Sequence, residues 1–115
     1  MKPRDRYYRF RAPRGALLTL RGKLVAEGRY FKTWVLEVLE AAARGEIPTE
    51  APPTESNGGM RWVSLRLGPR EARAYERAQH ALRAQGRTIA WLLRARIAEE
   101  VSRHAGSESL PVVRR

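Results

Sequence analysis

The 115-residue sequence contains no cysteine, so neither a disulfide framework nor a thiolate zinc site can stabilise it. It also lacks any run that approaches the roughly 20 apolar residues of a transmembrane helix, and we expect no membrane partner. The first residues lack the apolar core of a secretory signal, which predicts a cytoplasmic protein. Stability must therefore come from buried apolar side chains.

Patterns of catalytic or metal-binding residues are equally scarce. The only two histidines are His80 and His104, and neither has a carboxylate or cysteine at metal-ligand spacing. The acidic pairs on the predicted helices lie opposite the apolar faces. We therefore interpret these carboxylates as solvated side chains. We find no nucleophile, Gly-rich phosphate loop or catalytic dyad, and we expect no enzymatic activity, no cofactor and no metal.

Acidic side chains are few, and the formal net charge is +11. Residues 1–45 carry 11 basic and 4 acidic groups, whereas residues 46–60 carry 3 glutamates and no basic group. Residues 61–105 are basic again, with 10 basic and 4 acidic groups. Two basic segments flanking an acidic one indicate a polyanionic partner, and nucleic acid is favoured over a membrane surface.

The two basic segments share one apolar pattern, with little literal identity. Gly28-Arg29 recurs 58 positions later as Gly86-Arg87, and six apolar positions around them also coincide. A repeat of this kind predicts two similar units, each too small to be stable alone, that form one domain together. The predicted organisation is a flexible basic arm (1–6), a first unit (7–44), an acidic Pro/Gly linker (45–60), a second unit (61–105) and a flexible tail (106–115).

Each unit begins with alternating residues that predict a half-buried strand, over 7–12 and over 61–67. Two amphipathic helices follow each strand. Pro13 and Pro69 suit the first position of a helix, glycine ends the first helix of each unit, and Thr88 suits the N-cap of the last helix. The predicted apolar stripes are Leu17, Leu20 and Leu24; Phe31, Trp34, Val35, Val38, Leu39 and Ala42; Ala72, Tyr75, Ala78 and Leu82; and Ile89, Leu92, Leu93, Ile97 and Val101.

A lone strand cannot satisfy its own backbone, so each predicted strand needs a partner. The economical partner is the strand of the other unit. The expected fold is mainly α, with a two-stranded antiparallel ribbon and four helices behind it. The 16-residue linker could span about 50 Å when extended, so the ribbon can form within one chain. The high effective concentration of the tethered strands favours a monomeric pseudo-dimer.

These features resemble the ribbon-helix-helix family, the Arc and methionine-repressor class of DNA-binding proteins. The resemblance covers about residues 7–44 and 61–104 and is clearest in RWVSLRLGP (61–69) and GRTIAWLLRARI (86–97). It implies a tandem ribbon-helix-helix pseudo-dimer, a form known among accessory proteins of plasmid relaxosomes. The first unit departs from the pattern, because Tyr30 stands where Thr88 stands and its strand-to-glycine spacing is about two residues shorter.

A two-stranded ribbon fits the major groove of B-form DNA, where outward side chains can contact base edges. The unpaired N–H groups that begin each second helix favour a phosphate. The expected base contacts are Tyr7, Arg9, Arg11, Trp62, Ser64 and Arg66. The expected phosphate contacts are Arg29, Tyr30, Phe31, Lys32, Arg87, Thr88 and Ile89, with Lys2, Arg4 and Arg6 added by the arm.

The sequence therefore predicts sequence-specific binding of double-stranded DNA by a prokaryotic, nucleoid-associated protein. Transcription regulation is the commonest role in the resembling family. A plasmid relaxosome or partition role is one alternative, and an antitoxin-like or adaptor module that binds protein is another. RNA is disfavoured because its A-form major groove is deep and narrow. Association of pseudo-dimers on adjacent DNA sites stays open.

Overall fold

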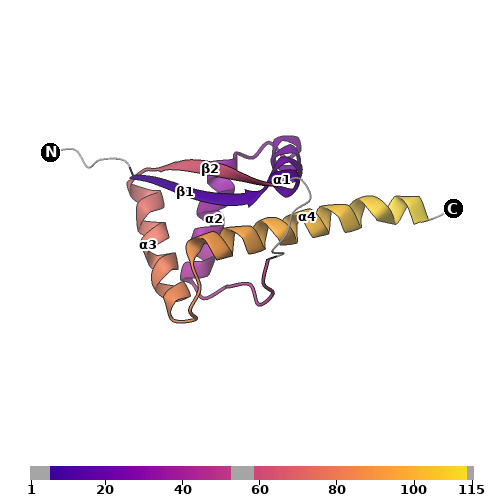
Figure 1. Cartoon of the computed structure of the whole chain (residues 1–115). Coiled ribbons are helices and arrows are strands. Elements are labelled where there is room, and N and C mark those ends of the chain that lie inside the picture. The colour runs from indigo at the N-terminus through magenta and orange to yellow at the C-terminus, as the bar shows by residue number, and fades with distance from the viewer. Residues whose placement is uncertain (1–5, 53–58, 114–115) are drawn as a thin grey trace.

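The computed structural model describes residues 6–52 and 59–113, with side chains described as far as residue 103. A two-stranded antiparallel sheet lies against four helices, which confirms the predicted ribbon and the mainly α fold (Figure 1). The order strand, helix, helix occurs twice. The elements are β1 (Arg6–Pro13), α1 (Arg14–Ala26), α2 (Phe31–Ala43), β2 (Met60–Leu67), α3 (Pro69–Arg83) and α4 (Ile89–Val113).

The ribbon places alternate residues of β1 and β2 on opposite faces. In its antiparallel register Phe10 lies opposite Val63, and Arg9 lies opposite Ser64. The Arg14 N–H donates to the Gly59 carbonyl at 3.0 Å and extends the pairing past the last strand residues. The inner face consists of Tyr8, Phe10, Ala12, Val63, Leu65 and Leu67, which are buried except for the half-buried Tyr8.

The helices bury the predicted stripes against this inner face. Leu17, Leu20 and Leu24 of α1 are all buried, as is every predicted residue of α2 except the half-buried Phe31. In α4 the stripe is buried from Ile89 to Ile97, and Val101 packs against it half-buried. The prediction was wrong in detail for α3. Its buried residues are Ala74, Ala78 and Leu82, while Ala72 and Tyr75 pack at the edge of the core.

The helices of the two halves interlock. The closest helix pairs are α2 with α3 and α1 with α4, so each helix packs mainly on one from the other half (Figure 1). Lys23 of α1 reinforces the second pair through an ion pair of 2.8 Å with Glu100. Hydrogen bonds to Glu100 and Glu27 raise the pKa of Lys23. Arg94 of α4 donates to the Arg11 carbonyl at 3.2 Å and ties α4 to the ribbon.

Each Gly-Arg repeat ends a helix in the same way. Gly28 and Gly86 have φ angles of 68° and 69°, in the left-handed region that favours glycine. The Arg29 N–H donates to the Leu24 carbonyl at 2.8 Å, and the Arg87 N–H donates to the Leu82 carbonyl at 2.9 Å. These bonds satisfy carbonyls that the helix leaves open. The repeated dipeptide is therefore a helix C-cap.

Several predicted boundaries were wrong. Arg6 belongs to β1 and not to a flexible arm, because its backbone pairs with Leu67. Pro13 ends β1 as the N-cap of α1, and β2 begins one residue early, at Met60. Gly106 does not end order, because α4 continues to Val113. One glycine costs a helix only about 1 kcal/mol relative to alanine and does not by itself stop it.

The predicted linker is partly packed where it is described. Ile47 packs against the core, Pro48 is buried, and the Glu46 carbonyl accepts a hydrogen bond of 2.9 Å from Arg96 of α4. Partial burial of Ile47 favours packing of this segment despite the polar residues around it. Residues 53–58 of the predicted linker lie outside the described residues.

We predict that Leu92→Ala lowers the free energy of unfolding by about 2–5 kcal/mol, because the substitution leaves a cavity where the side chain is fully buried. Denaturant titration measures the loss. Leu18→Ala is the matched control, since Leu18 is 56 % exposed and should change stability little. Equal losses in both variants would contradict the burial described for α4.

We also predict that stability falls as the pH rises above about 10. Burial, with Tyr75 nearby, raises the pKa of Tyr8, and burial also raises the pKa of Tyr75, from the ordinary value of 10.0. The unfolded chain therefore loses these protons first, so the stabilisation is complete below pH 10 and is lost above it. Melting between about pH 8 and 11 tests this. Tyr8→Phe/Tyr75→Phe should flatten the loss, whereas Tyr30→Phe, at an 80 % exposed position, should not.

Candidate functional site

The outer face of the ribbon carries all six residues predicted to contact bases. They form three opposed pairs in the register, and each of the six is exposed. Tyr7 and Trp62 are 70 % and 57 % exposed, unusual values for large aromatic side chains. The pairs are Tyr7 with Arg66, Arg9 with Ser64, and Arg11 with Trp62.

Trp62 organises the two arginines of β1. The guanidinium carbons of Arg9 and Arg11 lie 4.7 and 5.5 Å from the centroid of its ring. Cation–π contacts of this kind contribute about 0.5–1 kcal/mol at exposed sites. The indole therefore restricts both side chains in the free protein and lowers the entropy lost when a ligand orders them.

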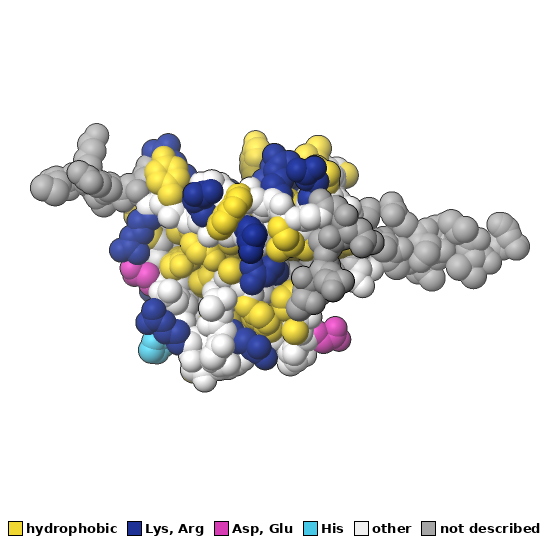
Figure 2. All heavy atoms as spheres, in the orientation of Figure 1, with side chains coloured by type: hydrophobic (Ala, Val, Ile, Leu, Met, Phe, Trp, Pro, Cys, Tyr) yellow, Lys and Arg dark blue, Asp and Glu magenta, His cyan; other side chains and the backbone are white. Residues whose placement is uncertain are grey.

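The charged side chains of this face are all basic. The six outward positions include Arg9, Arg11 and Arg66 and no carboxylate. In Figure 2 basic and hydrophobic side chains intermix along the ribbon side of the face shown, and acidic side chains appear only lower on its flanks. The outer face therefore combines positive charge with exposed aromatic rings.

The N-terminus of α4 has the cap predicted from sequence. The Thr88 hydroxyl accepts a hydrogen bond of 3.1 Å from the Trp91 N–H. Arg87 is exposed and stacks on Trp91, 4.5 Å from the ring centroid. The Ile89 side chain is buried, so that residue can offer a ligand only its backbone N–H. The start of α4 therefore carries a positive charge, and its first backbone N–H groups lack a carbonyl acceptor within the helix.

The N-terminus of α2 differs. Tyr30 occupies the N-cap, forms no side-chain cap and is 80 % exposed. Arg29 pairs with Glu27 and Glu37, and these carboxylates raise its pKa. Phe31 stacks on Trp34 with its ring half-buried. Lys32 lies 3.9 Å from the Glu71 carboxylate. The charge at this end is therefore largely matched by neighbouring acids.

The predicted arm contributes one described residue. Arg6 pairs with Glu76 of α3 at 3.1 Å, with both side chains more than half exposed. Exposed ion pairs are weak, so Arg6 can exchange this carboxylate for another anion at little cost. Lys2 and Arg4 lie outside the described residues.

Sequence reasoning missed two arrangements around the site. It did not predict that the rings of Trp62 and Trp91 each contact an arginine. An arginine near a tryptophan on the same predicted face was the available signal. It also missed a groove lined by arginines between α2 and α3, since no local pattern predicts which faces of two helices approach each other.

The described residues hold neither a metal-ligand cluster nor a helix suited to a membrane. Within the described part of the chain no three His, Cys, Asp or Glu residues are grouped to hold a metal ion. No helix among the described residues has the length and apolar character needed to cross a membrane. Comparisons with protein-family models, curated proteins and solved structures found no match to this chain.

We predict that the two helix N-termini respond oppositely to substitution. Thr88→Ala removes a side-chain cap and should cost about 1 kcal/mol of unfolding free energy. Tyr30→Thr supplies the acceptor that α2 lacks and should raise stability by about 0.5–1 kcal/mol. Denaturant titration measures both. Tyr30→Ala is the control, and an equal gain from alanine would show that removing the exposed ring, and not capping, is responsible.

Proposed function

We propose that this chain binds double-stranded DNA in a sequence-specific manner, as a tandem ribbon-helix-helix pseudo-dimer within one polypeptide. The observation that carries the proposal is the outer face of the ribbon. Its six exposed side chains include three arginines and no acid, on a two-stranded element of the width that the major groove admits. The helices pack behind the ribbon and leave this outer face exposed.

The chemistry of the six residues suits base recognition. An arginine can donate two hydrogen bonds to the O6 and N7 atoms of guanine, and a serine hydroxyl can donate or accept. Arg9 lies opposite Ser64, and Arg11 opposite Trp62, so the two strands offer different groups to the two halves of a site. A non-palindromic target follows, with more guanine on the side of Arg9 and Arg11.

Phosphate contacts would position the ribbon without reading sequence. The start of α4 is the better candidate, because Arg87 is exposed and its guanidinium stacks on the Trp91 ring. The start of α2 would contribute backbone N–H groups and the Tyr30 hydroxyl more than the charge of Arg29, which two glutamates already match. Transcription regulation is the role we propose for such binding.

The test is selection of preferred sites from random duplexes, followed by binding of arginine variants. Arg9→Ala and Arg66→Ala should each relax the preference at one or two base pairs, by about 1–3 kcal/mol per lost contact. Arg87→Ala should weaken binding to every sequence alike and reduce the slope of log K against log salt by about 1.

Arg103→Ala is the control, because Arg103 pairs with Glu100 on α4 and lies apart from the ribbon. Two outcomes would overturn the proposal. One is affinity for duplex DNA at low salt no better than that of a neutral protein. The other is a uniform loss of affinity for all sequences in Arg66→Ala, which would show that the ribbon does not read bases.

A further inference from the structure

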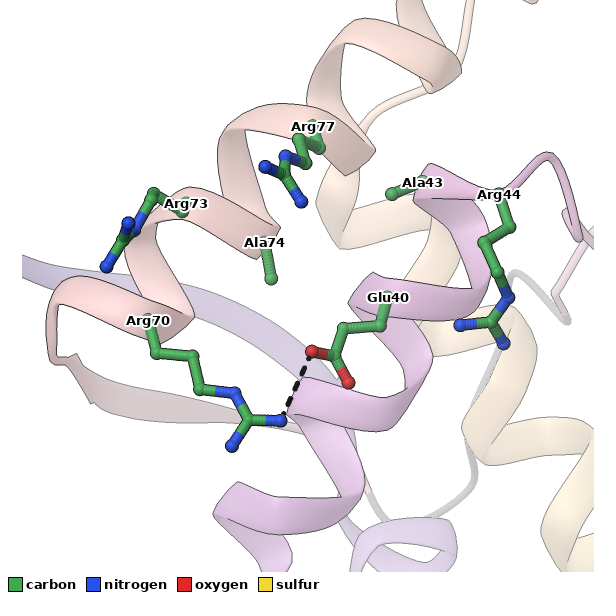
Figure 3. Close-up of a pocket in the computed structure, with 7 residues that line it drawn as sticks. All are labelled: Glu40, Ala43, Arg44, Arg70, Arg73, Ala74 and Arg77. Atoms are coloured by element: carbon green, nitrogen blue, oxygen red, sulfur yellow. Dashed lines mark hydrogen bonds and ion pairs between the residues drawn. The ribbon is translucent and has the colours of Figure 1, made fainter.

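A second basic surface lies between α2 and α3, and none of its residues belongs to the ribbon. The two helices pack side by side and leave an open groove of about 520 Å³ (Figure 3). Four arginines and one carboxylate line it, so positive charge exceeds negative charge by three. The lining residues are Glu40, Ala43, Arg44, Arg70, Arg73, Ala74 and Arg77.

The helical period of α3 builds this surface. Arg70, Arg73 and Arg77 are spaced three and four positions apart, which places them along one exposed side of the helix. A rise of 1.5 Å per residue spreads them over about 10 Å. Ala74 and Ala43 line the same groove, and their short side chains leave it open between the helices.

The acids nearby do not match this charge. Glu40 and Arg70 form an ion pair of 3.5 Å, but their side chains are 39 % and 73 % exposed, and such pairs contribute little. Arg44 pairs with Glu46. Within the described residues no carboxylate lies at ion-pair distance from Arg73 or Arg77; Arg73 donates only a long bond of 3.4 Å to the Pro69 carbonyl. The groove therefore keeps an unmatched positive potential.

The arrangement of the guanidinium groups indicates the shape of the anion. In Figure 3 Arg70 reaches across to Glu40, whereas Arg73 and Arg44 point away from each other at opposite sides of the groove. In this arrangement Arg73 and Arg44 do not converge on one phosphate. They can each meet a different member of a row of anionic groups, and the guanidinium fork matches phosphate oxygens.

We propose that the α2–α3 groove binds a chain of linked phosphates. The alanines of the groove offer no hydrogen bonds to bases, so the site recognises charge and spacing and not sequence. The chain can be the phosphodiester backbone of a nucleic acid or free inorganic polyphosphate. The site is separate from the ribbon and does not depend on base recognition there.

The test uses the full chain and the variant Arg73→Gln/Arg77→Gln. The matched control is Arg83→Gln/Arg103→Gln, which removes the same charge from exposed positions outside the groove. The probes are inorganic polyphosphate and a short duplex of random sequence, each at about 0.15 M salt, where charges more than about 8 Å apart are screened. Melting curves check that all variants fold.

We expect the groove variant to bind at least one probe about tenfold more weakly, and the control variant to stay within about twofold of the parent. A loss confined to polyphosphate identifies the free chain as the ligand, and a loss confined to the duplex identifies the nucleic-acid backbone. Equal losses in both variants, or no loss with either probe, would overturn the proposal. Base preference at the ribbon is measured separately, so either proposal can fail without the other.

Discussion

The pairing of β1 with β2 is the constraint on which the rest of the structure depends. Neither strand has another partner among the described elements, and a lone strand would leave its backbone N–H and carbonyl groups without partners in the fold. Pairing sets the register, the register sets the faces, and the inner face supplies the surface that the helices cover. Because α2 packs on α3 and α1 on α4, the helices of each half, like its strand, depend on the other half for their packing.

Local periodicity predicted the parts of the fold that local residues determine. Alternation identified both faces of the ribbon, and the helical stripes identified nearly every buried leucine, because a period is visible without knowing the neighbour. Contacts that need the register or the helix packing were not predictable in this way. The position of Trp62 between Arg9 and Arg11 is one example, and the arginine groove is another. Ile47 was missed because a single apolar residue in a Pro/Glu-rich segment makes no pattern.

The two halves have the same order of elements but differ in the lengths of those elements. Their N-caps, Pro13 and Gly68, are 55 positions apart, while the glycines that end the same helices are 58 apart. The first helix has 13 residues in one half and 15 in the other. The additional residues at the start of α3 include Arg70, whereas Arg73 and Arg77 stand where α1 has Gly15 and Thr19, so α1 has no equivalent row of arginines. Charge and shape therefore differ at the two ends of the ribbon.

The cross-packing of the halves also determines when the chain can fold. Strand partners are separated by 47 to 61 positions, so almost none of the ribbon can form from neighbouring residues. Contacts between distant positions form slowly, because a long loop must close first. During synthesis the first half emerges with an unpaired strand edge and uncovered leucines. The ribbon cannot form until β2 has been synthesised, and the two main helix pairs need α3 and α4 as well.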